Sequence, residues 1–179
     1  PNGNCTNGIV RYDMTGNSTY MSSGVFRNSV GISDASLKAL SVWNQLDYYN
    51  IWLVSEIDNN NGGAGIQGYA YFASSHGSAL DGAVMLASNF QSSGSTTAAH
   101  ELGHAFNLYH TFEGDNGGAS CPTDANCNTD GDLVCDTPPH IRSSSNCNPT
   151  GTNACDGGSS NSLFVHNHMD YSSDACQNE

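Results

Sequence analysis

The amino-acid sequence predicts an α+β fold with two lobes. Residues 1–107 contain two segments in which apolar residues recur at helical spacing, and three short runs that are typical of strands. Beyond Thr111 the composition shifts to Gly, Asn, Ser, Asp and Cys, with little periodicity. A chain of 179 residues is long enough for one hydrophobic core. We therefore expect a single domain over 1–179, with an N-terminal lobe of helices and strands (1–107) and a loop-rich C-terminal lobe (108–179).

The first helix is expected from Ile32 to Asp47. Ser33 and Asp34 can cap its N-terminus, because short polar side chains accept hydrogen bonds from the first free backbone N–H groups. Apolar residues then recur at helical spacing, at Leu37, Leu40, Trp43 (or Val42) and Leu46. This stripe indicates a helix that packs against the core.

Three strands and a second helix follow. Asn50 to Ile57 is an apolar run rich in β-branched and aromatic residues, and the polar loop 58–63 ends it, so it predicts a buried strand. Gly68 to Ala73 and Gly82 to Ala87 are the other strand candidates. A helix is expected from about Ser95 to Phe106, with Ser95 or Thr96 as its cap. Its apolar or small positions are Ala98, Ala99, Leu102 and Ala105.

The charge balance of the chain is strongly acidic. Seventeen acidic residues face four basic ones, Arg11, Arg27, Lys38 and Arg142, and the formal net charge is −13. Nucleic acid and anionic membranes are therefore disfavoured as partners, because both repel an acidic surface. No apolar run approaches the roughly 18 residues needed to span a bilayer, so no membrane segment is expected. The opening residues Pro1-Asn2-Gly3-Asn4 do not resemble a signal peptide, and we expect a mature or trimmed product.

Seven cysteines are present, and six of them lie in the last third of the chain, at positions 121, 127, 135, 147, 155 and 176. Clustered cysteines in loops rich in Gly, Ser and Asn indicate either disulfides or a structural zinc site. The spacings never give a Cys-x2-Cys pair, so we expect three disulfides and an oxidising, extracellular compartment. Cys5 is then left over, as a free thiol or for a partner outside this chain.

The segment that carries chemistry is His100-Glu101-Leu102-Gly103-His104, followed by His110. Positions four apart lie on the same face of a helix, so His100 and His104 can direct their imidazoles at one ion. A catalytic zinc usually takes three protein ligands and leaves the fourth position to water, and His110 can be the third ligand. The sequence thus predicts a zinc site made of these histidines, with Glu101 near a metal-bound water.

His110 can reach the metal only if the helix ends before it, and Asn107 is the expected end. Asparagine is among the few residues other than glycine that tolerate the left-handed backbone conformation that turns a chain at a helix end. The other histidines lack ligand spacing and are expected at the surface or behind the ligands: His76, His140, His166 and His168.

This pattern resembles the extended zinc motif of metzincins, with Asn107 where that family has glycine. A metzincin also has a Met-turn, and Asn167-His168-Met169-Asp170-Tyr171 is similar to it. Within the metzincins the chain looks like the pappalysin or cytophagalysin family. The segments that carry this resemblance are Gly103, Leu108-Tyr109-His110-Thr111-Phe112, Gly131-Asp132, Asp136-Thr137-Pro138 and Met169-Asp170-Tyr171. It implies a metzincin-like catalytic domain with a mixed twisted sheet and the active-site helix in the N-terminal lobe, a disulfide-held C-terminal lobe, and family elements missing at both ends.

The resemblance also implies roles for single residues. Met169 would lie beneath the metal without binding it, and Tyr171 would stabilise the oxyanion of the transition state. Asp132 with Thr137 would bind a structural calcium ion, for which a merely solvated acidic loop is the alternative. The implied disulfides are Cys147–Cys176 and a bridge from Cys155 to one of the upstream cysteines. Cys127 is the first choice for that bridge and leaves Cys121 to pair with Cys135, although spacing alone leaves the connectivity open.

We therefore expect a secreted zinc endopeptidase in which a zinc-activated water attacks an internal peptide bond of a protein or peptide, with Glu101 as general base. The substrate is expected to pair with 82–87 as an edge strand, and Asp174 could select a basic side chain just past the scissile bond. A prosegment or an inhibitor is a further expected partner. Two alternatives stay open: an inactive extracellular module that binds zinc and calcium, and an adhesion domain held by calcium and disulfides.

Overall fold

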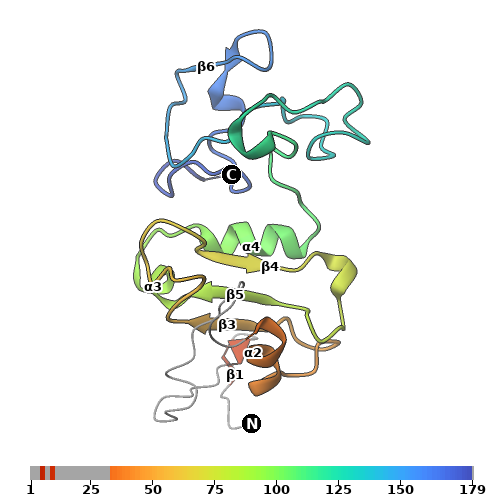
Figure 1. Ribbon diagram of the computed structural model, residues 1–179, viewed down its shortest axis with the longest axis vertical. Coiled ribbons are helices and arrows are strands. Elements are labelled where there is room, and N and C mark those ends of the chain that lie inside the picture. The colour runs from red at the N-terminus through yellow and green to blue at the C-terminus, as the bar shows by residue number, and fades with distance from the viewer. Residues whose placement is uncertain (1–4, 7–8, 11–32, 179) are drawn as a thin grey trace.

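A computed structural model describes residues 5–6, 9–10 and 33–178 of the chain. Figure 1 shows a lower part built from a small sheet with short helices, and an upper part built almost wholly from loops. We call the described residues up to 107 the sheet lobe and residues 108–178 the loop lobe. None of the helices in the described part of the chain has the length and apolar character that crossing a membrane requires.

A three-stranded mixed sheet forms the centre of the sheet lobe, in the order β3-β5-β4. β3 (Ile51–Val54) runs parallel to β5 (Ala83–Leu86), and β4 (Gly68–Ala70) runs antiparallel to β5. All three predicted strands are present, and each is shorter than expected. A separate antiparallel pair precedes them, β1 (Cys5–Thr6) with β2 (Ile9–Val10).

β5 is the central strand of this sheet, because it is paired on both sides, and all four of its residues are buried. The prediction that 82–87 is an edge strand open to a substrate is therefore wrong. Among the strands that the structure describes, the edge strand that packs beside helix α4 (Thr97–Ala105) is β4 (Figure 1). An apolar run identifies a strand, but the order of strands depends on pairing between distant segments, and the run itself holds no information about that pairing.

The first helix of the sheet lobe, α2, covers Asp34–Leu40 and is shorter than the predicted 32–47. The hydroxyl of Ser33 accepts a hydrogen bond from the backbone N–H of Ser36, so the expected cap is present. The start predicted at Ile32 lies outside the described residues. The core that this helix covers consists of Leu37, Trp52, Val54, Ile57, Val84 and Leu86.

The helix does not continue past Leu40 because the next segment is held by a side chain from beyond it. The side-chain amide of Asn50 accepts a hydrogen bond from the N–H of Trp43 at 2.9 Å and donates one to the carbonyl of Trp43 at 3.0 Å. These bonds occupy the backbone groups that a helix would have used. Leu46, predicted on the buried stripe, is consequently exposed.

Helix α4 lies on the side of the sheet lobe that faces the loop lobe (Figure 1), and it packs on β4 and β5. Its bounds agree with the predicted 95–106 to within two residues. The hydroxyl of Thr96 does not cap it but donates to the carboxylate of Asp174 at 2.8 Å and contacts the side chain of Gln177. The start of the helix is thus tied to residues near the end of the described chain. The remaining elements of the sheet lobe are the 3-10 turn η1 (Ala73–Ser75) and the short helix α3 (Ala87–Gln91).

The loop lobe contains little regular structure. Its elements are the 3-10 turns η2 (Asn116–Gly118) and η3 (Asn161–Leu163), and the paired strands β6 (Thr152–Asn153) and β7 (Ser159–Ser160). Its small apolar core consists of Phe164, Val165 and Cys176. Such a core is too small to hold some 70 residues together by burial alone, so covalent links are needed.

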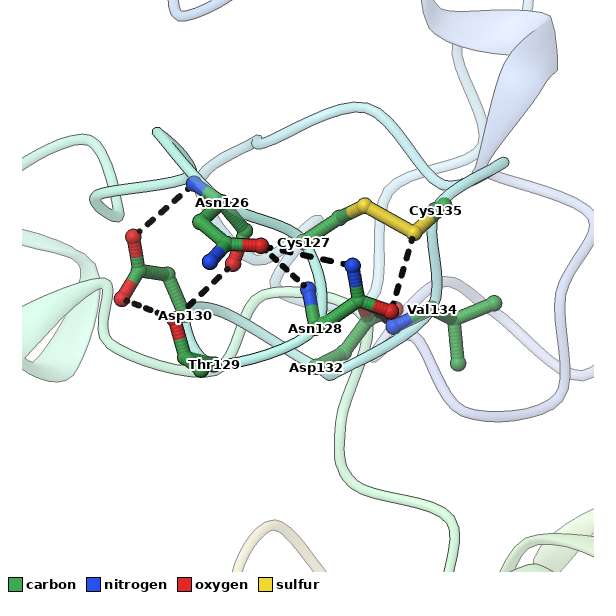
Figure 2. The surroundings of a disulfide bond; sticks show 8 residues. All are labelled: Asn126, Cys127, Asn128, Thr129, Asp130, Asp132, Val134 and Cys135. Carbon is green, nitrogen blue, oxygen red and sulfur yellow. Dashed lines mark hydrogen bonds between the residues drawn. A yellow bond between two sulfur atoms is a disulfide. The ribbon is translucent and has the colours of Figure 1, made fainter.

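Three disulfides supply those links: Cys121–Cys155, Cys127–Cys135 and Cys147–Cys176. The number of bridges and the pair Cys147–Cys176 agree with the expectation. Cys155 does bond to an upstream cysteine, but this is Cys121, so the choice of Cys127 for it and the pair Cys121–Cys135 are wrong. The backbone N–H groups of Thr129 and Asp130 both bond to the carbonyl of Asn126 at 2.9 Å, so the chain folds back and Cys127 meets Cys135 across a short loop (Figure 2). The sulfur of Cys5 lies outside what the structure describes.

Candidate metal centre

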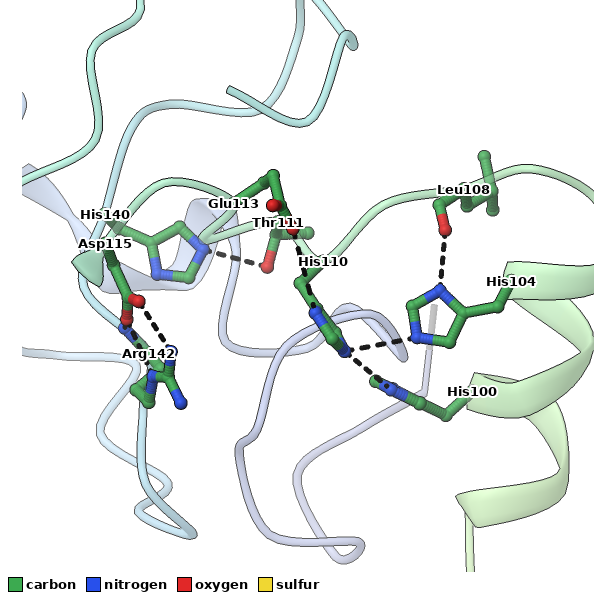
Figure 3. A network of polar contacts seen from close by, with 9 residues as sticks. All are labelled: His100, His104, Leu108, His110, Thr111, Glu113, Asp115, His140 and Arg142. Atoms are coloured by element: carbon green, nitrogen blue, oxygen red, sulfur yellow. Dashed lines mark hydrogen bonds and ion pairs between the residues drawn. The ribbon is translucent and has the colours of Figure 1, made fainter. Parts of the chain in front are cut away.

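Three histidines converge where α4 meets the loop lobe. His100 and His104 lie one turn apart on α4, and His110 follows the end of the helix (Figure 3). The Nε2 atom of His110 is 3.2 Å from Nε2 of His100 and 3.1 Å from Nε2 of His104. Among the described residues, this is the one group of three or more His, Cys, Asp or Glu side chains placed to hold a metal ion.

His110 reaches this point because the chain reverses at Asn107. Asn107 has a φ of 73°, which is the left-handed conformation. The N–H of Leu108 bonds to the carbonyl of Gly103 at 3.0 Å, and the N–H of Asn107 bonds to the carbonyl of His104 at 2.9 Å. These are the two hydrogen bonds that end a helix at a left-handed residue. A local turn thus adds a third imidazole to the two that the helix presents.

Backbone carbonyls orient two of the three imidazole rings. Nδ1 of His100 donates to the carbonyl of His168 at 2.7 Å, and Nδ1 of His104 donates to the carbonyl of Leu108 at 2.8 Å. Because a carbonyl oxygen can only accept, these bonds place the proton of each neutral ring on Nδ1. The Nε2 lone pairs of both rings then face the point where the three histidines meet, as in metal-binding histidines.

Burial also keeps these histidines neutral. Burial, together with the smaller effect of the neighbouring histidines, lowers the pKa of His100 to about 4 and that of His110 to about 3. The pKa of His104 is lowered as well, mainly by burial. All three rings are therefore unprotonated at neutral pH, which is the form that binds a metal.

The distances fit a zinc ion. Zinc bound tetrahedrally at about 2.0–2.1 Å from each imidazole nitrogen requires nitrogens about 3.3 Å apart. The two Nε2 separations given by His110 are 3.2 Å and 3.1 Å. A set of three imidazoles without thiolates or carboxylates also matches the ligands of known catalytic zinc sites.

Glu101 is buried beside the histidines, with only 4% of its surface exposed. Its Oε2 atom has no hydrogen-bond partner within the described part of the chain, and burial raises the pKa of the carboxyl to about 8. Gly68 of β4 leaves the space for this side chain, because a Cβ atom at Gly68 would lie 3.1 Å from Oε1. Among the described residues, this carboxyl oxygen between α4 and β4 thus has no partner. Gly68 was predicted to lie in a strand, but its role in making room for Glu101 was not predicted.

Met169 lies against the opposite side of α4. It is buried, and a Cβ atom at Gly103 would overlap its sulfur. The backbone of Met169 is held by two bonds: its N–H donates to the side chain of Asn167 at 2.8 Å, and its carbonyl accepts from Thr111 at 3.2 Å. The predicted Met-turn segment therefore contacts the helix between the two helical histidines.

Tyr171 lies next to the histidines but is not enclosed. Its ring centroid is 4.9 Å from that of His110 and 5.6 Å from that of His100. Burial raises the pKa of its hydroxyl. The structure thus brings the predicted catalytic tyrosine to the predicted ligands.

The other predicted site residues lie farther out. One carboxylate oxygen of Asp174, which is exposed, accepts the hydrogen bond from Thr96 at the start of α4. Asp132 is buried, accepts from the N–H of Val134 at 3.0 Å and is hydrogen-bonded by the side chain of Thr137. Burial raises the pKa of Asp132. The structure therefore brings Asp132 and Thr137 together.

Two features near the centre were not predicted. The first is an ion pair in which Arg142 donates to Asp115 through Nη2 at 2.6 Å and Nε at 2.8 Å (Figure 3). The second is His140, which is fully buried and not at the surface, with Nε2 at 2.9 Å from the hydroxyl of Thr111. These partners are 27 and 29 residues apart in a loop-rich region, where no spacing rule connects them.

A protein-family model, Peptidase M43, described as pregnancy-associated plasma protein-A, matches residues 31–179. An extracellular metalloprotease of Pyricularia oryzae is 39% identical over 140 residues, which are 73% of this chain and 43% of that protein. An extracellular metalloprotease of Arthroderma otae is 31% identical over 159 residues, which are 83% of this chain and 52% of that protein. The chain therefore spans about half the length of the curated relatives it matches.

Solved structures of similar fold exist. Mature mirolysin of Tannerella forsythia in complex with a cleaved peptide matches with a TM-score of 0.58 and 29% identity, over 81% of this chain and 53% of that chain. A promirolysin mutant of the same organism matches with a TM-score of 0.57 and 28% identity, over 81% of this chain and 47% of that chain.

Proposed function

Because the chain belongs to the Peptidase M43 family, we propose that it is the catalytic region of a secreted, zinc-dependent endopeptidase that cleaves internal peptide bonds. One observation carries the proposal: three neutral imidazoles converge beside a buried carboxyl, one oxygen of which has no hydrogen-bond partner among the described residues. Secretion is supported by the disulfides, which persist in oxidising compartments, and by relatives that are named extracellular metalloproteases.

His100, His104 and His110 would hold the zinc ion, which when bound polarises the scissile carbonyl and lowers the pKa of water. The carbonyls of His168 and Leu108 keep two of the rings turned toward the ion.

Glu101 acts as the general base. It takes the proton of the attacking water and passes it to the leaving amine. Its burial raises its pKa to about 8 when no metal is present, and the charge of a nearby metal ion lowers a carboxyl pKa. The two effects oppose each other.

Tyr171 stabilises the negative charge that develops on the substrate oxygen. A hydroxyl that approaches this oxygen donates a hydrogen bond that is stronger in the transition state than in the bound substrate. The proposal is supported by the position of its ring, 4.9 Å from that of His110.

The substrate lies extended along β4, the edge strand beside α4. A peptide can add to the edge of a sheet as a further strand. Glu101 lies directly behind Gly68 of this strand, so a peptide paired there passes the general base. Asp174 selects a basic side chain just past the scissile bond, and a prosegment covering the same strand would keep the enzyme latent.

A structural calcium ion is proposed at Asp132 and Thr137. The support is the buried carboxylate of Asp132 and its contact with the side chain of Thr137, since oxygen ligands suit calcium.

The proposal is tested by digestion of a mixed peptide library with the zinc-loaded protein, read by mass spectrometry. We expect internal cuts by the wild type and a loss of roughly a thousandfold or more in Glu101→Ala, which retains stoichiometric zinc. Glu56→Ala is the matched control, because it removes a glutamate that follows β3, the strand at the opposite edge of the described sheet from β4.

Two results would count against the proposal. Cuts by Glu101→Ala at the wild-type rate would exclude Glu101 as the base. A wild type that holds zinc but makes no cuts would favour the inactive zinc- and calcium-binding module. The identity of the residue after each cleaved bond tests the role of Asp174 separately. Equal cleavage before basic and apolar residues would contradict that role.

A further inference from the structure

The ring of Tyr171 lies beside the histidines, but its own burial does not hold it there. The side chain is 40% exposed. A half-exposed aromatic side chain changes rotamer freely unless neighbours restrict it. A tyrosine that is to meet a reacting oxygen must be held to within a fraction of an ångström, so other residues have to fix this ring.

Two side chains that are not predicted metal ligands lie against the ring of Tyr171. The ring of Phe112 is 4.7 Å away and stacks in turn on His110 at 4.8 Å. The guanidinium carbon of Arg142 lies 5.7 Å from the ring centroid of Tyr171 and 4.8 Å from that of Phe112. Arg142 therefore contacts both aromatic rings at once, as cation–π pairs do.

Arg142 is itself firmly held. Its Nη2 and Nε atoms donate to the two carboxylate oxygens of Asp115 at 2.6 Å and 2.8 Å, and its backbone N–H donates to the same carboxylate at 3.2 Å (Figure 3). Asp115 is only 2% exposed. The hydrogen bonds from Arg142 lower the pKa of Asp115 to about 2, so the carboxylate stays charged at neutral and mildly acidic pH. The guanidinium plane is thus fixed by a buried partner before it meets Tyr171.

The residues after Arg142 hold the backbone of the same segment. The N–H of Ser143 donates to the buried carboxylate of Asp170 at 3.2 Å. The N–H of Ser145 donates to the carbonyl of Tyr171. The stretch 142–145 therefore contacts both the ring and the backbone carbonyl of Tyr171.

We propose that Arg142, fixed by Asp115, is a positioning residue that keeps the ring of Tyr171 beside His100 and His110 during the reaction. This inference rests on the proposed function, because it assumes that Tyr171 takes part in peptide hydrolysis. In this proposal Arg142 acts through Tyr171, because its guanidinium is held by Asp115 and lies 5.7 Å from the ring centroid of Tyr171. Lysine cannot replace it, because an ammonium group lacks the planar fork that binds the carboxylate and stacks on the rings.

The alternative is that the Asp115–Arg142 pair only braces the loop lobe. The two readings differ in what happens when the hydroxyl of Tyr171 is already absent. If Arg142 positions Tyr171, substitution of Arg142 no longer lowers kcat once the hydroxyl is absent. If the pair only braces the loop lobe, the substitution lowers kcat by the same factor with and without the hydroxyl.

The first experiment is a double-mutant cycle with Arg142→Lys and Tyr171→Phe, measured as kcat and KM on one peptide. We expect Arg142→Lys to lower kcat roughly 10- to 100-fold with KM nearly unchanged, because it displaces a group that acts only in the transition state. In the Tyr171→Phe background the same change should lower kcat less than about twofold. Lysine keeps a positive charge opposite Asp115, so this variant avoids leaving a buried charge unpaired.

Val165→Ala is the matched control for lost stability. Val165 is buried in the core of the loop lobe, in the cluster with Phe164 and Cys176, so its truncation destabilises the same lobe. We expect Val165→Ala to lower the thermal midpoint at least as much as Arg142→Lys, while kcat below that midpoint is retained.

A second readout needs no activity. In protein labelled with 3-fluorotyrosine, the fluorine resonance of Tyr171 is the one that Tyr171→Phe removes. Arg142→Lys and Asp115→Asn should shift or broaden this resonance, and Val165→Ala should leave it in place.

The proposal is overturned by equal kcat losses in both tyrosine backgrounds, by equal losses in Arg142→Lys and Val165→Ala, or by an unchanged fluorine resonance. If the wild type cleaves no peptide, the proposed function fails, and the fluorine spectrum still decides whether Arg142 positions the ring.

Discussion

Gly103 lies on α4 between His100 and His104, where the sulfur of Met169 approaches the helix backbone. A Cβ atom at Gly103 would overlap that sulfur. Met169 cannot easily retreat, because it is buried and its carbonyl is bonded to Thr111, the residue after His110. Glycine inside a helix costs about 1 kcal/mol relative to alanine. Close packing at the metal centre is a physical reason for its presence here.

We expect Gly103→Ala to lower the free energy of unfolding by about 1–3 kcal/mol, because overpacking outweighs the better helix propensity of alanine. Denaturant unfolding of the zinc-loaded protein measures this change. Combining it with Met169→Ala makes room for the new methyl group, so the double variant should lose less than the two single losses added together. A Gly103→Ala protein as stable as the wild type would mean that the contact is not tight.

Lys38 marks the limit of what the sequence shows for a single residue. The sequence shows that this residue is charged, but it does not predict that the residue is buried. In the structure Lys38 is only 1% exposed. Its amine donates to the carbonyl of Leu80 at 2.6 Å and lies 4.2 Å from the ring centroid of Tyr71. Burial lowers the pKa of this amine. The partner Leu80 is 42 residues away, so no local pattern could reveal the contact.

At the scale of elements, the turn at the end of α4 decides whether the third histidine meets the other two. Asn107 adopts a φ of 73°, which costs a residue with a Cβ atom about 1–2 kcal/mol and costs glycine almost nothing. Asparagine tolerates this conformation better than alanine does. The strain of the turn is therefore linked to the position of His110.

We expect Asn107→Gly to leave the free energy of unfolding unchanged or to raise it by up to about 1 kcal/mol, and Asn107→Ala to lower it by about 1 kcal/mol. Zinc affinity, measured by competition with a chelator, should fall in Asn107→Ala. The matched control is Asn59→Ala, because Asn59 has a similar φ of 65° but lies in a loop of the sheet lobe. That control should lose stability and keep its zinc affinity. An equal loss of zinc affinity in both variants would mean that the turn at Asn107 has no specific effect on zinc binding.

Elements whose signals are local were predicted well. Helix α4 and the turn at Asn107 follow from residues within a dozen positions of one another, so their pattern is visible in the sequence. The order of the strands was not predicted, because the pairing of β3 with β5 joins segments about 30 residues apart. Helix α2 was predicted too long for a similar reason, since Asn50, which occupies the backbone of Trp43, lies outside the periodic stretch.

At the scale of the whole molecule, the disulfides are unequal in what they constrain. Cys147–Cys176 closes a loop of 29 residues that contains the Met-turn, whereas Cys127–Cys135 closes one of 8 residues. In the chain-entropy description these loops stabilise the fold by about 3.6 and about 2.5 kcal/mol. Cys147 also lies two residues after the stretch 142–145 that contacts Tyr171.

We therefore expect Cys147→Ser with Cys176→Ser to lower the free energy of unfolding by about 1 kcal/mol more than Cys127→Ser with Cys135→Ser. The first pair should also weaken zinc binding, because it releases the segment whose His168 carbonyl orients His100. Denaturant unfolding and chelator competition measure the two effects. Zinc affinities that fall equally in both double variants would contradict this division of roles.

The contacts that complete the metal centre join residues far apart in the chain: 68 positions separate His100 from His168, and 78 separate Thr96 from Asp174. A ribosome adds about 5–20 residues per second, so α4 emerges roughly 3 to 14 seconds before the carbonyl that orients its first histidine. Until then the histidines lie on a helix that lacks its long-range partners. The proposed peptidase activity therefore arises only after residues 168–177 have been translated and folded, and the growing chain is not exposed to it.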